Sequence, residues 1–199
     1  MIDSYLTIKD KSIGEYSEKR SKFLAFAYHV ENTNEIKALV NQHEKEYYDA
    51  RHVCYAYMLG HQHDVFRAVD NGEPSGTAGK PILGQIVKYN LTNILVIVVR
   101  YFGGIKLGTS GLANAYKQAT ALALDNAETE ERTVDSQISV FFEYPLLNDI
   151  MRVVKELNPQ IIKQDFQLNC QLILQIRQSE AEMLTSRLGK IRGVTIESN

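Results

Sequence analysis

A glycine-rich segment with several polar side chains, residues 70–81, is the part of the sequence best suited to bind a ligand. It contains three glycines, a serine, a threonine and a lysine ahead of an apolar stretch with helical spacing. Glycines let backbone N–H groups approach a ligand, and a helix N-terminus presents unpaired N–H groups with partial positive charge. The segment therefore predicts an anion-binding turn, although its spacing is not that of a Walker A loop. A purely structural turn ahead of a capped helix is the equally weighted alternative.

A second glycine-rich turn, residues 100–111, places cationic side chains at the end of an apolar run. Arg100 and Lys106 flank a Gly-Gly pair, and another helical pattern follows. In sheets covered by helices, ligands often bind at such strand ends. Two cationic turns, each ahead of a helix, favour a shared anion site. The alternative is that Arg100 forms a structural ion pair with Asp70 or Glu73.

Two side chains near these turns are candidates for acid–base chemistry. His52 enters a predicted strand, and Glu73 lies inside the first glycine-rich segment. An isolated histidine is more often structural, and no Ser-His-Asp or paired-carboxylate motif is evident. His61 and His63 with Asp64 fit a solvated turn better than a metal site, so no metal is expected.

Composition limits the classes of function. The 199 residues carry a net charge of −2, which argues against nucleic-acid binding driven by overall charge but permits a local basic patch. The cluster Lys19, Arg20 and Lys22 is one such patch. Cys54 and Cys170 form no Cys-x-x-Cys motif and are expected to be buried. With no secretory signal and no apolar run long enough to span a bilayer, a cytoplasmic protein that does not enter the membrane is expected.

The segments around the two turns predict the elements that position them. Strands are expected at residues 14–30, 53–59, 65–69 and 94–99, the last buried on both faces. Helices are expected after an N-cap at Asn32, around residues 82–87, and from about residue 111 with Thr109 or Ser110 as the N-cap.

The remainder of the chain predicts a second domain. Residues 126–135 are acidic and contain little that is apolar, which indicates a linker. Beyond them the apolar pattern follows the order β-α-β-β-α-β, typical of a ferredoxin-like sandwich. A capping box of Ser179 and Glu182 is expected to start the last helix. The expected class is α+β, with domains at residues 1–130 and 135–199.

Four stretches together closely resemble the IMPACT/YigZ family. They are Ser21-Lys22-Phe23 and residues 50–57, 70–81 and 95–111. The last two are highly specific in length and order. The likeness extends from about residue 15 to residue 125, and the C-terminal segment resembles the smaller domain of bacterial members.

The resemblance implies a fold and a cellular context. The N-terminal domain would be an α/β sandwich similar to domain IV of elongation factor G and to a small-subunit ribosomal protein. The C-terminal domain would be similar to domain V of that factor. Both likenesses imply a connection with translation, and eukaryotic members regulate translation by binding a co-activator of a stress kinase. The family implies no established enzymatic activity, and no cofactor is expected.

Three hypotheses on function follow. The leading one is a translation-linked regulatory protein that contacts RNA, the ribosome or a translation-associated protein through its cations. The second is an enzyme acting on a small phosphorylated ligand or nucleotide, with Glu73 and His52 as acid–base groups. The third is a protein-interaction module without a small ligand. The candidate anion-binding residues are Asp70, Gly72, Glu73, Ser75, Gly76, Thr77, Arg100, Gly103, Gly104, Lys106, Gly108 and Ser110, and the candidate RNA contacts are Lys19, Arg20 and Lys22.

Overall fold

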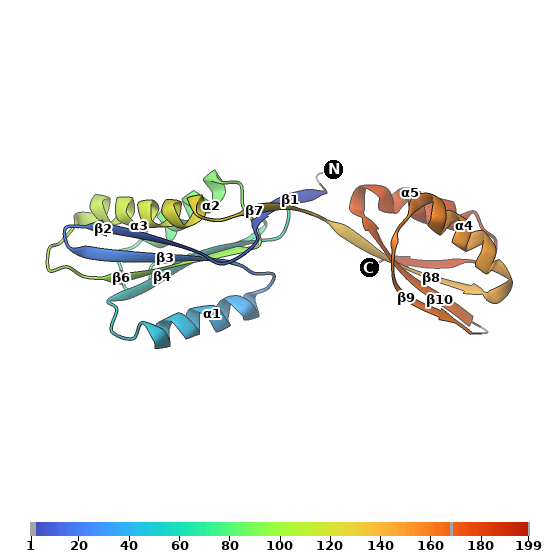
Figure 1. The fold of residues 1–199 in the computed structure, drawn as a ribbon, viewed down its shortest axis with the longest axis horizontal. Helices are drawn as coiled ribbons and strands as arrows, with labels where there is room; N and C mark the ends of the chain where they lie inside the picture. The colour runs from blue at the N-terminus through green and yellow to red at the C-terminus, as the bar shows by residue number, and fades with distance from the viewer. Residues whose placement is uncertain (1–2, 168, 199) are drawn as a thin grey trace. The chain divides into compact units, whose positions relative to one another are not determined.

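The computed structural model describes residues 3–167 and 169–198, which form two compact units (Figure 1). One unit is Tyr5–Arg132. The other runs from Thr133 onward and includes the start of the chain up to Ser4. Among the described residues, no helix is both long and apolar enough to cross a membrane.

A five-stranded antiparallel sheet forms the centre of the first unit. Its strand order is β2-β3-β6-β4-β5, so β6 lies in the middle. The strands are β2 (Ser12–Glu18), β3 (Ser21–His29), β4 (His52–Leu59), β5 (Val65–Val69) and β6 (Ile94–Tyr101). The first seven residues of β6 are buried, which confirms the prediction of a strand covered on both faces. The expected strand material at residues 14–30 is a hairpin whose turn is formed by Lys19 and Arg20.

Helices cover both faces of this sheet. Helix α1 (Thr33–Glu46) lies on one face, and α2 (Gly79–Lys88) and α3 (Gly108–Asp125) lie on the other (Figure 1). Each face has its own apolar core, because alternate residues of the central strands point to opposite sides. The Asn32 side chain accepts hydrogen bonds from two amides of the first turn of α1, so the expected N-cap is confirmed.

The two units meet between Arg132 and Thr133, inside the predicted linker at residues 126–135, but part of that segment is a regular strand. Residues Thr129–Thr133 form strand β7, which pairs with β1 (Ser4–Ile8) in a two-stranded sheet. The Glu130 carboxylate accepts a hydrogen bond from Arg132 Nε at 2.7 Å, so charges of opposite sign stabilise the strand. A composition that resembles a solvated linker is therefore compatible with a regular strand here.

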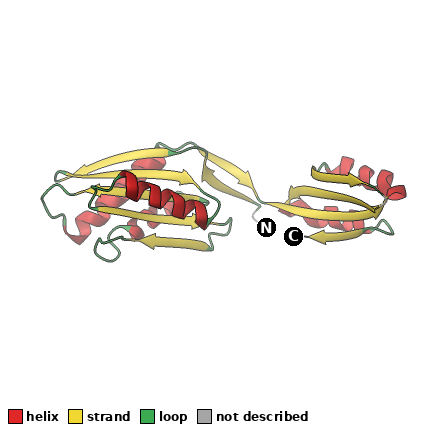
Figure 2. Ribbon diagram, turned by 90° about the horizontal axis from the view of Figure 1, so that it is seen from below, coloured by secondary structure: helices red, strands yellow, loops and turns green. Residues whose placement is uncertain are grey.

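The second unit has the order β-α-β-β-α-β that the sequence predicted (Figure 2). Its sheet order is β11-β8-β10-β9, antiparallel throughout, and its apolar core also includes residues of both helices. The elements are β8 (Asp135–Glu143), a short 3-10 helix η1 (Tyr144–Leu146), α4 (Leu147–Leu157), β9 (Gln160–Phe166), β10 (Asn169–Arg177), α5 (Gln178–Gly189) and β11 (Thr195–Ser198).

The predicted capping box at the start of α5 was wrong. Helix α5 begins at Gln178, one residue before Ser179, and no side chain caps its first turn. The Ser179 hydroxyl instead donates to the Asp3 carboxylate. That hydrogen bond lowers the pKa of Asp3. A partner 176 residues away in the chain has displaced the local motif.

A buried histidine makes the stability of the first unit sensitive to pH. His43 of α1 is 1% exposed. Its Nδ1 lies 2.9 Å from the Leu39 carbonyl, and its Nε2 lies 3.2 Å from the Tyr28 hydroxyl. Burial lowers the pKa of His43, because the charged imidazolium is poorly solvated there.

We expect the free energy of unfolding to fall as the pH drops below about 6.5. The unfolded chain then binds a proton at His43 that the folded chain does not, so protonation favours unfolding. His43→Gln should show a smaller loss of stability between neutral pH and mildly acidic pH, measured by urea unfolding. His61→Gln, in a turn, is the control and should keep the wild-type pH dependence. Equal pH dependence in wild type and His43→Gln would contradict the expectation.

Candidate functional site

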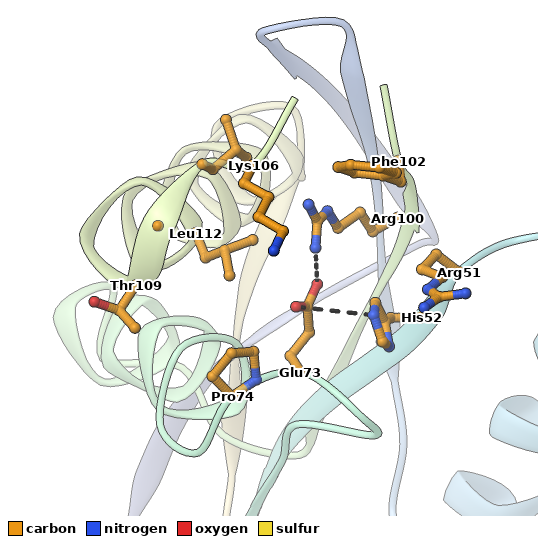
Figure 3. Close-up of a pocket in the computed structure, with 11 residues that line it drawn as sticks. Arg51, His52, Glu73, Pro74, Arg100, Phe102, Lys106, Thr109 and Leu112 are labelled. Atoms are coloured by element: carbon orange, nitrogen blue, oxygen red, sulfur yellow. Dashed lines mark hydrogen bonds and ion pairs between the residues drawn. The ribbon is translucent and has the colours of Figure 1, made fainter. Parts of the chain in front are cut away.

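The candidate residues from the strands meet at one end of the five-stranded sheet. Arg100 on β6 pairs in register with His52 on β4 and with Phe23 on β3, so all three side chains share one face. Beside them is a cavity of about 600 Å³. It is lined by Arg51, His52, Glu73, Pro74, Arg100, Phe102, Lys106, Leu107, Gly108, Thr109 and Leu112 (Figure 3).

Glu73 is the acidic centre of this site. Its carboxylate Oε1 accepts hydrogen bonds from Arg100 Nη1 at 2.6 Å and from the Tyr116 hydroxyl at 2.8 Å. The side chains of Glu73 and Arg100 are 2% and 7% exposed, so their charges offset each other away from water. Of the two ion-pair partners that the sequence allowed for Arg100, the structure selects Glu73.

Arg100 is enclosed by aromatic rings. Its guanidinium carbon lies 5.6 Å from the ring centroids of both Phe23 and Phe102. Cation–π attraction therefore supplements the ion pair with Glu73. The Arg100 Nε is buried and has no hydrogen-bond acceptor in the described structure. The guanidinium is thus held firmly while part of its donor capacity is unused.

His52 is held in one tautomer when neutral. Its Nδ1 lies 3.0 Å from the backbone carbonyl of Asn71, and a carbonyl can only accept a hydrogen bond, so Nδ1 carries the proton. Its Nε2 lies 3.9 Å from the second carboxylate oxygen of Glu73, Oε2. In the neutral ring, Nε2 is therefore a hydrogen-bond acceptor beside a carboxylate oxygen.

Tyr116 contacts the Glu73 carboxylate, and Cys54 in turn contacts Tyr116. The Cys54 thiol contacts the Asp70 carbonyl at 2.8 Å and the Tyr116 hydroxyl at 3.4 Å. Burial raises the pKa of Cys54 to about 12, so the thiol stays protonated at neutral pH and is a poor nucleophile. Burial also raises the pKa of Tyr116, whose neutral hydroxyl donates to Glu73. Both cysteines are buried, as expected.

The amides of the first glycine-rich segment already bind an anion, the side chain of Asp70. Its carboxylate accepts from the backbone N–H groups of Gly76 at 2.7 Å, Ala78 at 3.0 Å and Gly79 at 2.8 Å. Burial opposes ionisation of Asp70, but these three hydrogen bonds outweigh it and lower the pKa. The N-terminus of α2 is therefore occupied by the chain itself, and the structural-turn interpretation fits this segment better.

Other residues of this segment shape the turn. The Thr77 hydroxyl donates to the Pro74 carbonyl at 2.6 Å. Gly72 has a φ of +88°, and a Cβ at this position would lie 3.1 Å from His52 Nδ1. Gly76 also has a positive φ, and Ser75 is exposed. Of the candidates in this segment, Glu73 alone lines the cavity.

The second glycine-rich turn leaves its helix uncapped. Helix α3 begins at Gly108 rather than near residue 111, and its N-cap position is Leu107, with no capping side chain and no acidic residue in the first turn. Thr109 and Ser110 lie inside the first turn, so the N-cap predicted for one of them was wrong. Lys106, Leu107, Gly108 and Thr109 line the cavity. The partial positive charge of an 18-residue helix thus borders the cavity.

Two cations beside the cavity have no carboxylate partner. Arg51 and Lys106 both line it, and neither forms an ion pair within the described part of the chain. The Lys106 side chain extends toward Arg100 and Glu73 (Figure 3). Arg51 was not among the predicted site residues, although it directly precedes His52 in the sequence. Tyr116 was predicted only as a buried helix residue, because its contact with Glu73 depends on the tertiary fold.

The basic hairpin turn lies beside the second glycine-rich turn. Gly103 N–H donates to the Ser21 hydroxyl at 3.1 Å, and a Cβ on Gly103 would lie 2.1 Å from the backbone of Arg20. Gly103 is thus required for this close approach. Lys19 and Arg20 form the turn, whereas Lys22 pairs with the Glu15 carboxylate at 3.0 Å. Gly104 has a positive φ with open space around it.

We expect Asp70→Asn to lower the free energy of unfolding by about 2 kcal/mol at neutral pH, because charged hydrogen bonds to the loop amides are lost. The lowered pKa means that this contribution is present above the unfolded-state value of about 3.9 and is lost as the pH falls through the folded-state value. The difference in the free energy of unfolding between wild type and variant, measured by urea unfolding, should therefore become smaller in acid. Asp10→Asn, at an exposed site, is the control. A variant as stable as wild type at neutral pH would refute the role assigned to Asp70.

Comparisons with known proteins identify the family. The family model of the Impact N-terminal domain matches residues 19–124. An IMPACT family member of Haemophilus influenzae is 34% identical over 186 residues, covering 92% of this chain and 90% of the relative. The IMPACT family member YigZ of Escherichia coli is 36% identical over 151 residues, covering 75% and 74%.

A solved structure extends the likeness to both units. A crystal structure described as that of a hypothetical protein is 28% identical, covers 98% of this chain and 97% of that chain, and superposes with a TM-score of 0.74. This agrees with the mixed α/β fold in two units. On the family model and the relatives together, the chain belongs to the IMPACT family.

Proposed function

We propose that this protein binds phosphate groups of RNA in the cavity beside Glu73 and that it acts in connection with translation. One observation carries the proposal: the uncapped N-terminus of α3 borders a cavity that is also lined by Arg51 and Lys106. An uncapped helix N-terminus offers backbone N–H groups with partial positive charge. Two cations without carboxylate partners supply the full charges that phosphate recognition requires.

The charge balance of the cavity supports an anionic ligand. Glu73 is the acidic residue in its lining, and its charge is offset by the ion pair with Arg100. Arg51 and Lys106 are therefore unopposed, although the whole chain has a net charge of −2. The basic turn of Lys19 and Arg20 packs beside the Gly103 turn at the same end of the sheet and could contact further phosphates.

The connection with translation rests on the family. The family resemblance implies that the N-terminal unit is similar to domain IV of elongation factor G and the C-terminal unit to domain V, and we include this likeness in the proposal. The partner would then be ribosomal RNA, the ribosome or a translation-associated protein. Fold likeness alone is a weak basis for function, so the cavity geometry is the main support.

We expect the double variant Arg51→Ala, Lys106→Ala to bind a fluorescent single-stranded RNA at least about tenfold more weakly than wild type in low salt, because charges facing phosphates are lost. Fluorescence anisotropy across a salt series measures this. The logarithm of the binding constant decreases with the logarithm of the salt concentration, and the steepness of this decrease should be smaller by about one for each phosphate-contacting cation removed. Lys37→Ala on α1 is a matched control at an exposed position. Absence of binding by wild type at low salt, or unchanged binding by the double variant, would contradict the proposal.

A second candidate function is an enzyme acting on a small phosphorylated ligand. The specific observation in its favour is the distance of 3.9 Å between His52 Nε2 and Glu73 Oε2 at the cavity. In this function His52 would accept a proton while the cations stabilise negative charge.

A panel of nucleotides and sugar phosphates tests this candidate by thermal shift followed by product analysis. We expect a ligand that raises the melting temperature of wild type to do so much less for Lys106→Ala. Conversion of that ligand should be lost in His52→Ala while the shift remains. A panel without shift and without turnover would rule out this candidate.

A further inference from the structure

Glu73 offers the cavity a hydrogen-bond acceptor. Its Oε1 accepts hydrogen bonds from Arg100 and Tyr116. Its Oε2 accepts no hydrogen bond within the described part of the chain. His52 Nε2 lies 3.9 Å from Oε2. Oε2 points into the space between Lys106 and Pro74 (Figure 3). A carboxylate oxygen without a donor from the chain is free to accept a hydrogen bond from a ligand or from water.

His52 presents a second acceptor at the same point. The Asn71 carbonyl holds the proton on Nδ1, so Nε2 carries the lone pair in the neutral ring. A phosphodiester oxygen carries no proton and cannot donate to either atom. The part of a ligand that reaches Glu73 and His52 must therefore be a hydrogen-bond donor, and a hydroxyl could contact both acceptors.

The arrangement thus demands a ligand with two kinds of group. One phosphate would lie near Lys106 and the start of α3, a second would lie near Arg51 beyond His52, and a hydroxyl would lie against the two acceptors between them (Figure 3). A ribonucleotide carries both within one residue, since its ribose hydroxyls lie close to the phosphates. Recognition of ribose hydroxyls by an acidic side chain is well established in nucleotide-binding folds.

We propose that Glu73 Oε2 and His52 Nε2 select RNA over DNA by accepting a hydrogen bond from a ribose 2′-hydroxyl. The 2′-hydroxyl is the group that lets a protein distinguish RNA from DNA at a given position. This inference rests on the phosphate binding proposed above and adds to it a specificity for the sugar. Arg51 and Lys106 provide affinity, and Glu73 with His52 provides the discrimination.

The first experiment changes the ligand and leaves the protein intact. Binding of wild type is measured by anisotropy for a uridine oligonucleotide, its deoxyuridine counterpart and its 2′-O-methyl counterpart, which cannot donate at that position. The RNA should bind about tenfold to a hundredfold more tightly than the other two, as expected for one hydrogen bond to a charged acceptor. Uridine and deoxyuridine monophosphates, used as competitors, show whether the site takes a free nucleotide or requires a strand.

The second experiment assigns the discrimination to the two acceptors. His52→Ala removes one acceptor and leaves the Glu73–Arg100 pair and Tyr116 in place, so the protein should still fold, which its melting temperature checks. Its preference for RNA over DNA should fall severalfold or more. His61→Ala removes a histidine from a turn elsewhere in the same unit and should keep the full preference.

The outcomes separate this inference from the proposal beneath it. Tight binding with equal affinity for RNA, DNA and 2′-O-methyl RNA would overturn the inference and leave phosphate binding standing. Preference for RNA that persists unchanged in His52→Ala would also overturn the role assigned to His52. No binding of any oligonucleotide at low salt would overturn both proposals. A preference that falls in His52→Ala but not in His61→Ala would support the inference.

Discussion

The buried ion pair of Glu73 and Arg100 is the interaction on which the site depends. It joins the loop after β5 to the central strand β6, and the Tyr116 hydroxyl adds helix α3 to the same carboxylate. Transfer of both charges out of water is costly, and the close contact of 2.6 Å together with the surrounding aromatic rings offsets that cost. Removal of either partner would leave a buried charge uncompensated. The pair fixes the position and direction of the remaining carboxylate oxygen.

The two helix N-termini close to this pair differ in whether an acidic side chain of the same chain binds their amides. At the start of α2, the Asp70 carboxylate accepts hydrogen bonds from three backbone amides, those of Gly76, Ala78 and Gly79. Among the described residues no side chain caps the start of α3, which borders the cavity with Lys106. The difference follows from where the acidic residues lie, since both turns are rich in glycine and both precede helices. A glycine-rich turn therefore becomes a candidate anion site only where the chain leaves its amides unoccupied.

The sequence predicted the elements with strong local periodicity and missed those that depend on distant partners. The six apolar residues at 94–99 identified the central strand, and Asn32 identified the start of α1. Strand β7 was missed because its charged residues are typical of a linker, and its pairing with β1 connects residues more than 120 positions apart. The capping box at Ser179 failed for the same kind of reason, since Asp3 binds its hydroxyl.

The sequence predicted some residues of the site and missed others. The sequence brought Glu73, Arg100 and Lys106 together as candidates and named the Glu73–Arg100 pair as one alternative. It did not indicate that Asp70 would fill the start of α2, because that carboxylate acts from six to nine residues upstream rather than from the N-cap position. Arg51 and Tyr116 were missed because their roles arise from the sheet register and helix packing that place them beside the cavity.

We have proposed that phosphate groups bind at the start of α3; the start of α2 is already occupied by the Asp70 carboxylate. A nuclear magnetic resonance titration of the isotope-labelled full chain with a short single-stranded RNA tests it most directly. We expect large, saturable shifts for the backbone amides of Lys106, Gly108 and Thr109 and for the His52 ring. The amides of Gly76, Ala78 and Gly79 should move little, because Asp70 holds them. Large shifts at those three amides with little change around Lys106 would show that the RNA binds at the start of α2 instead.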